Sequence, residues 1–141
     1  MRNTRLGPMI KIKSAAVPTA GAATGITFTE VDCTGYDRAL YVLHTGAAGT
    51  GATLAFKVEE AAATGMGSPA DITSAASAGL TAAANASKIH TYDIPVNPAK
   101  PFQMGVGTIG TQTLANSCLC ILYKAARYPV DTAYATEAIV V

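Results

Sequence analysis

YDRALYVLHTGAAGTGATLAFKVEE, residues 36–60, is the stretch that decides the fold class. Its last part alternates apolar and polar positions, which predicts a strand with one buried face; the apolar positions are Leu54, Phe56 and Val58. Residues 38–44 are apolar on both faces, which predicts a central strand covered on two sides. Between these segments, residues 44–51 hold three glycines that allow the chain to reverse without steric cost. We therefore predict one long β-hairpin.

The rest of the chain repeats this pattern in shorter pieces. Residues 26–31 and 88–96 alternate, residues 102–107 resume the alternation with Phe102, Met104 and Val106 inward, and residues 119–124 are again apolar on both faces. Turn signals recur about every ten residues, as in sandwiches and jelly rolls. The fold class expected is all-β: an antiparallel β-sandwich of about seven or eight strands, jelly-roll-like.

Three segments define the expected domain organisation. An extended N-terminal arm spans residues 1–25, with one short edge strand around Ile10 and Ile12; the β-sandwich spans 26–126, and an extended C-terminal tail spans 127–141. Within the sandwich, alanine-rich residues 73–86 can form either a helix or short strands. Interrupting glycine, serine and threonine favour the strands.

Composition indicates a component of an assembly. Only 13% of the 141 residues are charged, against about 25% in an average soluble domain, while 50% are apolar. Such a surface suits a protein that packs against others. The net charge of +1 gives no global attraction to nucleic acid or anionic membranes. No apolar run is long enough to span a membrane, and no secretory signal is visible, so we expect the protein in a cytoplasm.

Candidate metal and phosphate sites do not meet the requirements of their chemistry. Three cysteines are an odd number, which predicts reduced core thiols rather than disulfides; they are Cys33, Cys118 and Cys120. A zinc site at Cys118 and Cys120 would need further ligands, and Cys33, His44 and His90 lack ligand spacing. We expect the two histidines to be satisfied structural residues. The glycines of residues 46–51 lack the Lys-Ser/Thr pair and helix of a phosphate loop.

No catalytic constellation is visible in the sequence. No serine sits in a G-x-S-x-G elbow, and the adjacent carboxylates Glu59 and Glu60 point to opposite faces of a strand. Six tyrosines could stack single-stranded bases, but no basic groove accompanies them. We therefore predict no enzyme, no catalytic residues, no cofactor and no bound metal.

Several segments resemble small virion proteins of tailed bacteriophages. The residues that carry the likeness are VDCTGYD at 31–37, FKVEE at 56–60, Asp71-Ile72 after a glycine-rich turn, and LYKAARYP at 122–129. Within that group the chain is most similar to head cement or decoration proteins, of the kind carried by short-tailed Bordetella phages. The likeness covers most of residues 26–129 and is a pattern of turns and apolar alternation rather than a catalytic signature.

This resemblance implies a virion protein on the outer capsid surface, assembled in the host cytoplasm, which bridges neighbouring major capsid subunits and stabilises the expanded shell. It implies as partners the major capsid protein and a second copy, in a homodimer or alternatively a trimer, with no membrane and no direct nucleic-acid contact. A phage tail or connector component is the alternative, followed by a soluble ligand-binding β-domain.

The two arms are the expected protein-contact elements, since extended segments can add strands to a neighbour's sheet. The basic N-terminal arm could touch an acidic protein surface or a phosphate backbone, or only solubilise the terminus. The candidate contact residues are Arg2, Arg5, Met9, Ile10, Lys11, Ile12, Lys13, Tyr128, Tyr134, Ile139, Val140 and Val141.

Overall fold

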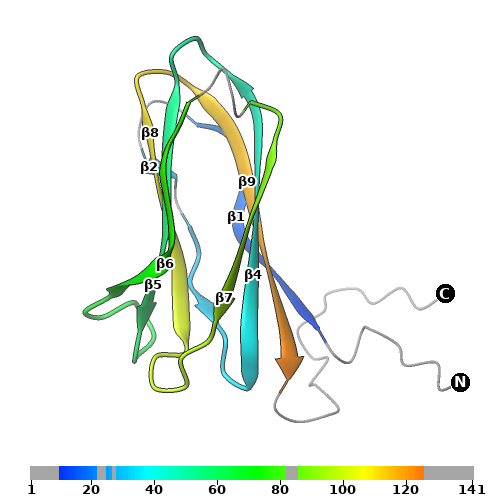
Figure 1. Cartoon of the computed structure of the whole chain (residues 1–141), viewed down its shortest axis with the longest axis vertical. Coiled ribbons are helices and arrows are strands. Elements are labelled where there is room, and N and C mark those ends of the chain that lie inside the picture. The colour runs from blue at the N-terminus through cyan, green and yellow to red at the C-terminus, as the bar shows by residue number, and fades with distance from the viewer. Residues whose placement is uncertain (1–9, 22–24, 27, 82–85, 126–141) are drawn as a thin grey trace, which may run out of the picture.

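A computed structural model of the chain describes residues 10–21, 25–26, 28–81 and 86–125. Every regular element in these ranges is a β-strand (Figure 1). The strands are β1 (Lys11–Gly21), β2 (Gly25–Ile26), β3 (Val31–Asp32), β4 (Tyr36–Ala48), β5 (Thr53–Ala61), β6 (Ala70–Thr81), β7 (Ile89–Pro95), β8 (Phe102–Gly110) and β9 (Leu114–Ala125).

The strands form two antiparallel sheets that face each other (Figure 1). Sheet A has the order β1-β9-β4-β7, and sheet B has the order β2-β8-β5-β6, with β3 also pairing with β8. The chain crosses repeatedly from one sheet to the other, so that its first and last described strands, β1 and β9, are neighbours. This arrangement is a jelly roll. The predicted all-β, antiparallel sandwich is confirmed.

The predicted hairpin over residues 36–60 is wrong. β4 pairs with β7 and β9, whereas β5 pairs with β6 and β8, so the glycine-rich turn carries the chain from sheet A to sheet B. Gly49 donates its N–H to the Thr113 carbonyl (2.9 Å), and Ala52 donates to the Gly49 carbonyl (3.0 Å). Gly51 has φ +83°, which only glycine adopts at little cost. Turn chemistry favours a reversal but does not select the partner strand.

Element boundaries differ from expectation at three places. β1 occupies residues that we assigned to an extended arm, and it lies at the edge of sheet A as an eleven-residue strand. The single strand expected at residues 26–31 is split into β2 and β3. β6 extends through Thr81, so the helix alternative is wrong over 73–81. Residues 82–85 and the predicted tail 127–141 lie outside the described residues.

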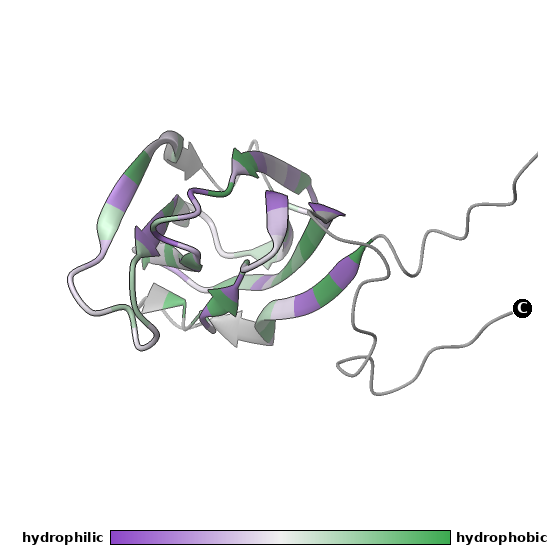
Figure 2. Ribbon diagram, turned by 90° about the horizontal axis from the view of Figure 1, so that it is seen from below, coloured by the Kyte–Doolittle hydropathy of each residue, from purple (hydrophilic) through white to green (hydrophobic). Residues whose placement is uncertain are grey.

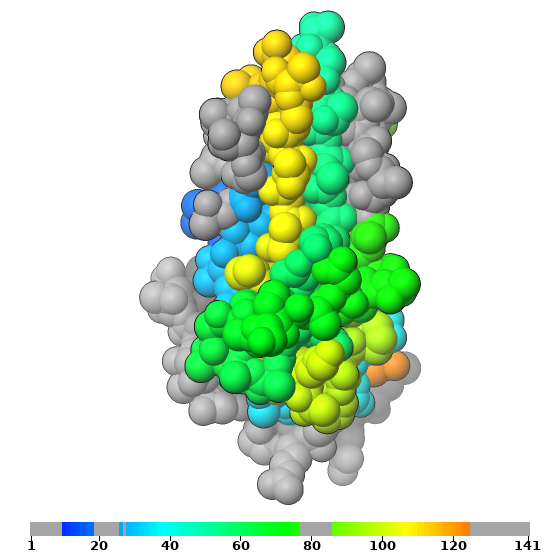
Figure 3. All heavy atoms as spheres, turned by 90° about the vertical axis from the view of Figure 1, so that its left-hand side faces the viewer, coloured from blue at the N-terminus to red at the C-terminus, as the bar shows by residue number. Residues whose placement is uncertain are grey.

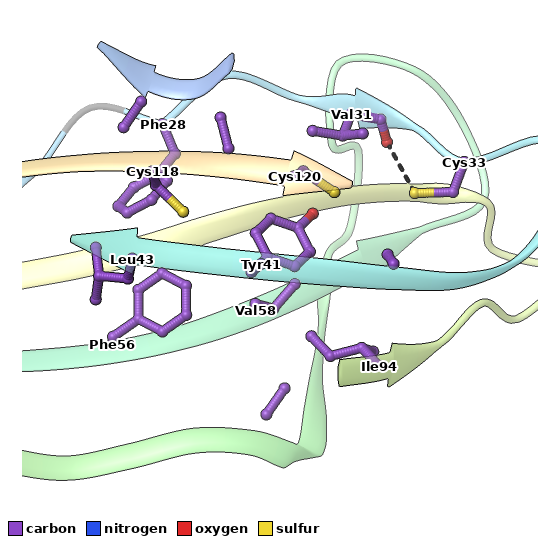
Figure 4. Close-up of a cluster of buried hydrophobic side chains, with 14 of the residues drawn as sticks. Phe28, Val31, Cys33, Tyr41, Leu43, Phe56, Val58, Ile94, Cys118 and Cys120 are labelled. Atoms are coloured by element: carbon purple, nitrogen blue, oxygen red, sulfur yellow. Dashed lines mark hydrogen bonds between the residues drawn. The ribbon is translucent and has the colours of Figure 1, made fainter. Parts of the chain in front are cut away.

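The core fills the space between the two sheets (Figure 4). Leu54, Phe56 and Val58 are buried on β5, as the alternation predicted. The Phe28 ring lies 5.4 Å from the Phe56 ring, which lies 4.7 Å from the Tyr92 ring, measured between centroids. This aromatic row joins three segments of the chain and contributes beyond its buried area.

The inward face of β8 is the reverse of the predicted one. Phe102, Met104 and Val106 are only half-buried, while the buried positions are Gln103, Gly105, Gly107 and Ile109. The glycines lie beneath Phe28 and Ile26: a Cβ at Gly105 would meet Phe28 Cδ1 at 2.5 Å, and one at Gly107 would meet Ile26 Cδ1 at 2.9 Å. Large side chains from β2 and the segment after it therefore fill the core volume that β8 leaves empty.

Candidate interaction face

The outer face of sheet A carries a continuous apolar surface, here called the outer A face. Ile12, Ile121 and Leu40 lie opposite one another on β1, β9 and β4, and Leu119 lies opposite Val42 in the next row. Residues opposite one another across antiparallel strands share a face. Ile12 is 57% exposed and Leu119 is 47% exposed. Figure 2 shows the alternation of hydrophobic and hydrophilic residues along such strands.

This face explains why two strands are apolar on both sides. The inward-facing apolar residues of β4 and β9 belong to the core; Tyr41, Cys120 and Leu122 among them are fully buried. The outward-facing apolar residues of β4 and β9 are not covered by sheet B, because sheet B lies on the inner side of sheet A. No other described element forms a layer on the outer side. The apolar residues of this face lie on β1, β9 and β4, whereas β7 contributes Thr91 and Asp93. A contiguous exposed apolar patch is a candidate contact surface.

A polar cluster bounds the outer A face at one end. Asp93 on β7 accepts hydrogen bonds at Oδ1 from the Tyr123 hydroxyl (2.6 Å) and Arg38 Nε (3.0 Å), and Arg38 Nη2 lies 2.9 Å away. The Arg38 guanidinium, followed by the Tyr123 hydroxyl, lowers the pKa of Asp93 and keeps the carboxyl ionised. The cluster is exposed, so it fixes side-chain positions more than it stabilises the fold.

The outer face of sheet B is charged by comparison. Lys57 Nζ lies 2.7 Å from both Glu59 Oε1 and Asp71 Oδ1. Figure 3 shows β8 and β5 side by side on this surface, with the β5–β6 segment projecting across its lower part. The charged side chains already have partners on their own chain. The outer A face is the more apolar of the two.

The interior holds the three cysteines as free, buried thiols, as predicted. Burial raises the pKa of Cys118 and of Cys120 to about 12 and raises that of Cys33 further, so all three stay protonated. Cys33 Sγ donates to the Val31 carbonyl at 3.5 Å (Figure 4). Within the described ranges no group of three or more potential metal ligands gathers.

The histidines do not fit the expectation of satisfied structural residues. His44 is exposed on β4, and His90 on β7 is partly buried. His90 Nε2 is itself buried and has no hydrogen-bond partner within the described part of the chain. The two residues point to opposite faces of sheet A, since His44 pairs with Ile89 and His90 with Leu43.

Of the predicted contact residues that the structure describes, only Ile12 joins the outer A face. Lys11 and Lys13 lie opposite the buried Leu122 and Cys120, so they point to the inner side. Burial raises the pKa of Asp32, but hydrogen bonds from Thr34 and the charges of the two lysines outweigh it and lower that pKa.

Ile10 precedes β1 and is partly buried. The other predicted contact residues lie outside the described ranges: Arg2, Arg5, Met9, Tyr128, Tyr134, Ile139, Val140 and Val141. Sequence reasoning missed Leu40, Val42, Leu119 and Ile121 as surface residues. Their signal was present, but apolarity on both faces was taken as burial on both faces.

Comparisons with known proteins place the chain in no family. No family model and no curated protein matches it. A subunit of the disulfide-linked pili of Bacillus endospore appendages is similar over 82% of this chain and 88% of its own, at 13% identity and a TM-score of 0.44. A family 11 carbohydrate-binding module from Clostridium thermocellum is similar over 84% and 86%, at 10% identity and a TM-score of 0.36. At these values neither likeness bears on what this protein binds.

The described residues also contain no helix that is long and apolar enough to cross a membrane.

Proposed function

We propose that this protein is a capsid cement of a tailed phage, which binds the outer surface of the head and bridges neighbouring major capsid subunits. The observation that carries the proposal is the outer A face, where Ile12 and Leu119 are exposed beside Leu40, Val42 and Ile121. A large apolar patch on a weakly charged chain is a surface made to be covered. The role is binding, with no turnover.

The ends of two strands support the same role. Lys11, at the start of β1, lies opposite Leu122, near the end of β9, so the start of β1 and the end of β9 lie at the same end of sheet A. Both strand ends lie beside the apolar face. Contacts made by the face and by an arm of one molecule raise each other's effective concentration, and many weak contacts then hold a shell together.

Introduction of a positive charge at Leu119 provides the test. Heads of the source phage, stripped of the protein, are incubated with purified wild type, Leu119→Lys or Thr108→Lys and sedimented. Thr108 is exposed on β8, on the outer face of sheet B, so it is a control that adds the same charge elsewhere. We expect wild type and Thr108→Lys to bind at a fixed ratio to capsid subunits and to raise the temperature at which heads rupture. Leu119→Lys should stay in the supernatant while its circular dichroism is unchanged.

Each other result has a definite meaning. Binding of Leu119→Lys at wild-type affinity would exclude the outer A face as the contact. Failure of the wild type to bind heads, together with a ring of six or more copies by native mass spectrometry, would replace the cement role with a tail or connector role. A monomer that does not bind would contradict both and leave a ligand-binding β-domain.

A further inference from the structure

The edge strands of the two sheets differ in how well they resist pairing with another chain. β1 has two register shifts against β9 and contains Pro18, and β6 has two register shifts against β5. β2 and β3 are two residues long. Bulges, prolines and short lengths are the devices that block edge-to-edge association. β7 lacks them up to its last residue, Pro95, and pairs with β4 in an unbroken register.

The hydrogen bonds at the two ends of β7 show which of its residues bond to β4 and which point their backbone groups away from the sheet. Thr45 donates its N–H to the Lys88 carbonyl, and Val96 donates to the Asp37 carbonyl, both at 2.9 Å. Bonded and non-bonded pairs alternate along an antiparallel ladder. The even-numbered residues of β7 therefore bond to β4. The odd-numbered residues point their N–H and C=O groups away from the sheet.

The outward-directed residues are Ile89, Thr91 and Asp93, and all three side chains are exposed. Pro95, which has no N–H, falls in the same set, as this alternation requires. In the described ranges no acceptor meets any of the three N–H groups. The Asp93 carbonyl accepts from Arg38 Nη2 at 3.2 Å, and its second lone pair remains for another donor. β7 thus offers an extended row of backbone groups.

This row is complementary to itself. With a two-fold axis at Thr91, each Thr91 lies opposite its copy, and each Ile89 lies opposite the Asp93 of the other molecule. Each of these three pairs exchanges two hydrogen bonds, about six in all. A two-residue shift of this register in one direction would place Pro95 in the bonded row, and Pro95 has no N–H to donate. A two-residue shift in the opposite direction would place Ser87 in the bonded row, and the φ of 56° at Ser87 is not that of an extended strand.

We propose that two copies of this protein pair through β7 in antiparallel register about Thr91, which joins their two A sheets into one continuous sheet. No like charges face each other in this register, and threonine opposite threonine is a favourable cross-strand pair. Residues opposite one another share a face, so both outer A faces lie on the same side of the joined sheet. If the proposed cement function holds, one dimer presents two faces to two capsid subunits. The strand pairing itself does not depend on that function.

Cysteine substitution tests the register. Residues in a bonded antiparallel pair have Cα atoms about 5.5 Å apart, within the range that a disulfide spans. Thr91→Cys should therefore crosslink to its own copy under mild oxidation, to near completion on a non-reducing gel. Ile89→Cys is the matched control on the same strand, since the register places the two copies of residue 89 about 14 Å apart. The three native thiols are buried and do not compete.

Thr91→Pro tests the backbone contribution without breaking the ladder to β4, because the Thr91 N–H points away from it. We expect its dimer dissociation constant, by sedimentation equilibrium, to rise at least about tenfold through the loss of the two central bonds. Circular dichroism should match the wild type.

A wild type that stays monomeric up to high micromolar concentration would overturn the proposal. So would equal crosslinking of Ile89→Cys and Thr91→Cys, or a Thr91→Pro variant that dimerises like the wild type. A dimer with the predicted crosslink that fails to bind heads leaves the strand pairing standing and contradicts only the cement role. A monomer that binds heads would contradict the strand pairing and leave the cement role standing.

Discussion

Gly105→Ala should destabilise the protein strongly for the addition of one methyl group. The new Cβ would lie 2.5 Å from Phe28 Cδ1 and 2.7 Å from Cε1, whereas carbon atoms in contact sit about 3.5–4.0 Å apart. The Phe28 ring would have to move by about 1 Å. It packs against Phe56, which packs against Tyr92, so the ring cannot retreat freely.

The expected magnitude follows from this lack of room. Overpacking a core costs about 1–3 kcal/mol, and a site without slack belongs in the upper half of that range, about 2–3 kcal/mol. The unfolding entropy of a chain of 141 residues is roughly 0.3 kcal/mol per kelvin, so the melting temperature should fall by about 7–10 °C. Differential scanning calorimetry on purified protein measures this shift.

Two further variants make the result decisive. Gly67→Ala is the control, because a Cβ there meets nothing within 4 Å and its φ lies outside the left-handed region; its cost should stay below about 0.5 kcal/mol. Phe28→Leu removes the ring edge, so Gly105→Ala in that background should lose at least about 1 kcal/mol less than in the wild type. A Gly105→Ala shift under about 3 °C, or an equal penalty in both backgrounds, would refute the reasoning.

Two more predictions concern polar and sulfur groups in the core. The three cysteine thiols should not react with a disulfide reagent at pH 8 in the folded protein, because burial raises the pKa values of Cys33, Cys118 and Cys120. The absorbance of the released product should show that all three react only after denaturation. Rapid reaction of any of them in the native protein would place that thiol at the surface. Gln103→Leu should leave stability unchanged or raise it by about 1 kcal/mol, because neither amide atom of this fully buried side chain has a hydrogen-bond partner in the described part of the chain. A loss of more than about 1 kcal/mol in urea titration would mean that the amide is hydrogen-bonded.

The sequence allowed the strands to be placed better than the pairing between them. Alternation located β5 and β7, and assigned the buried face of β5 correctly, because a period of two is a local property of the chain. The glycines of residues 46–51 predicted a reversal but not its destination, since the same turn can lead to the next strand of one sheet or to the opposite sheet. The facing of β8 was wrong for a different reason: Gly105 and Gly107 face inward, and the volume is supplied by Phe28 from elsewhere in the sequence.

The same limit applied to the candidate interaction face. Residues 38–44 of β4 were predicted to be covered on both sides, and residues 119–124 of β9 show the same apolar pattern on both faces. An apolar pattern indicates that a surface is buried in the functional state, but it does not indicate whether the same chain or another molecule buries it. The basic residues of the first segment were chosen for their charge, and Lys11 and Lys13 turn toward the inner side instead.

The position of β9 between β1 and β4 has a consequence for synthesis of the protein. Sheet A lacks its central partner until the last described strand has been made, so the first strand must wait for more than a hundred residues of chain before it can pair. Pairings between such distant segments form slowly. During that interval the apolar sides of β4 are exposed, and self-association competes with folding. We expect the nascent chain to complete its fold only after β9 has emerged from the ribosome, and its yield to depend on temperature and on chaperones during translation.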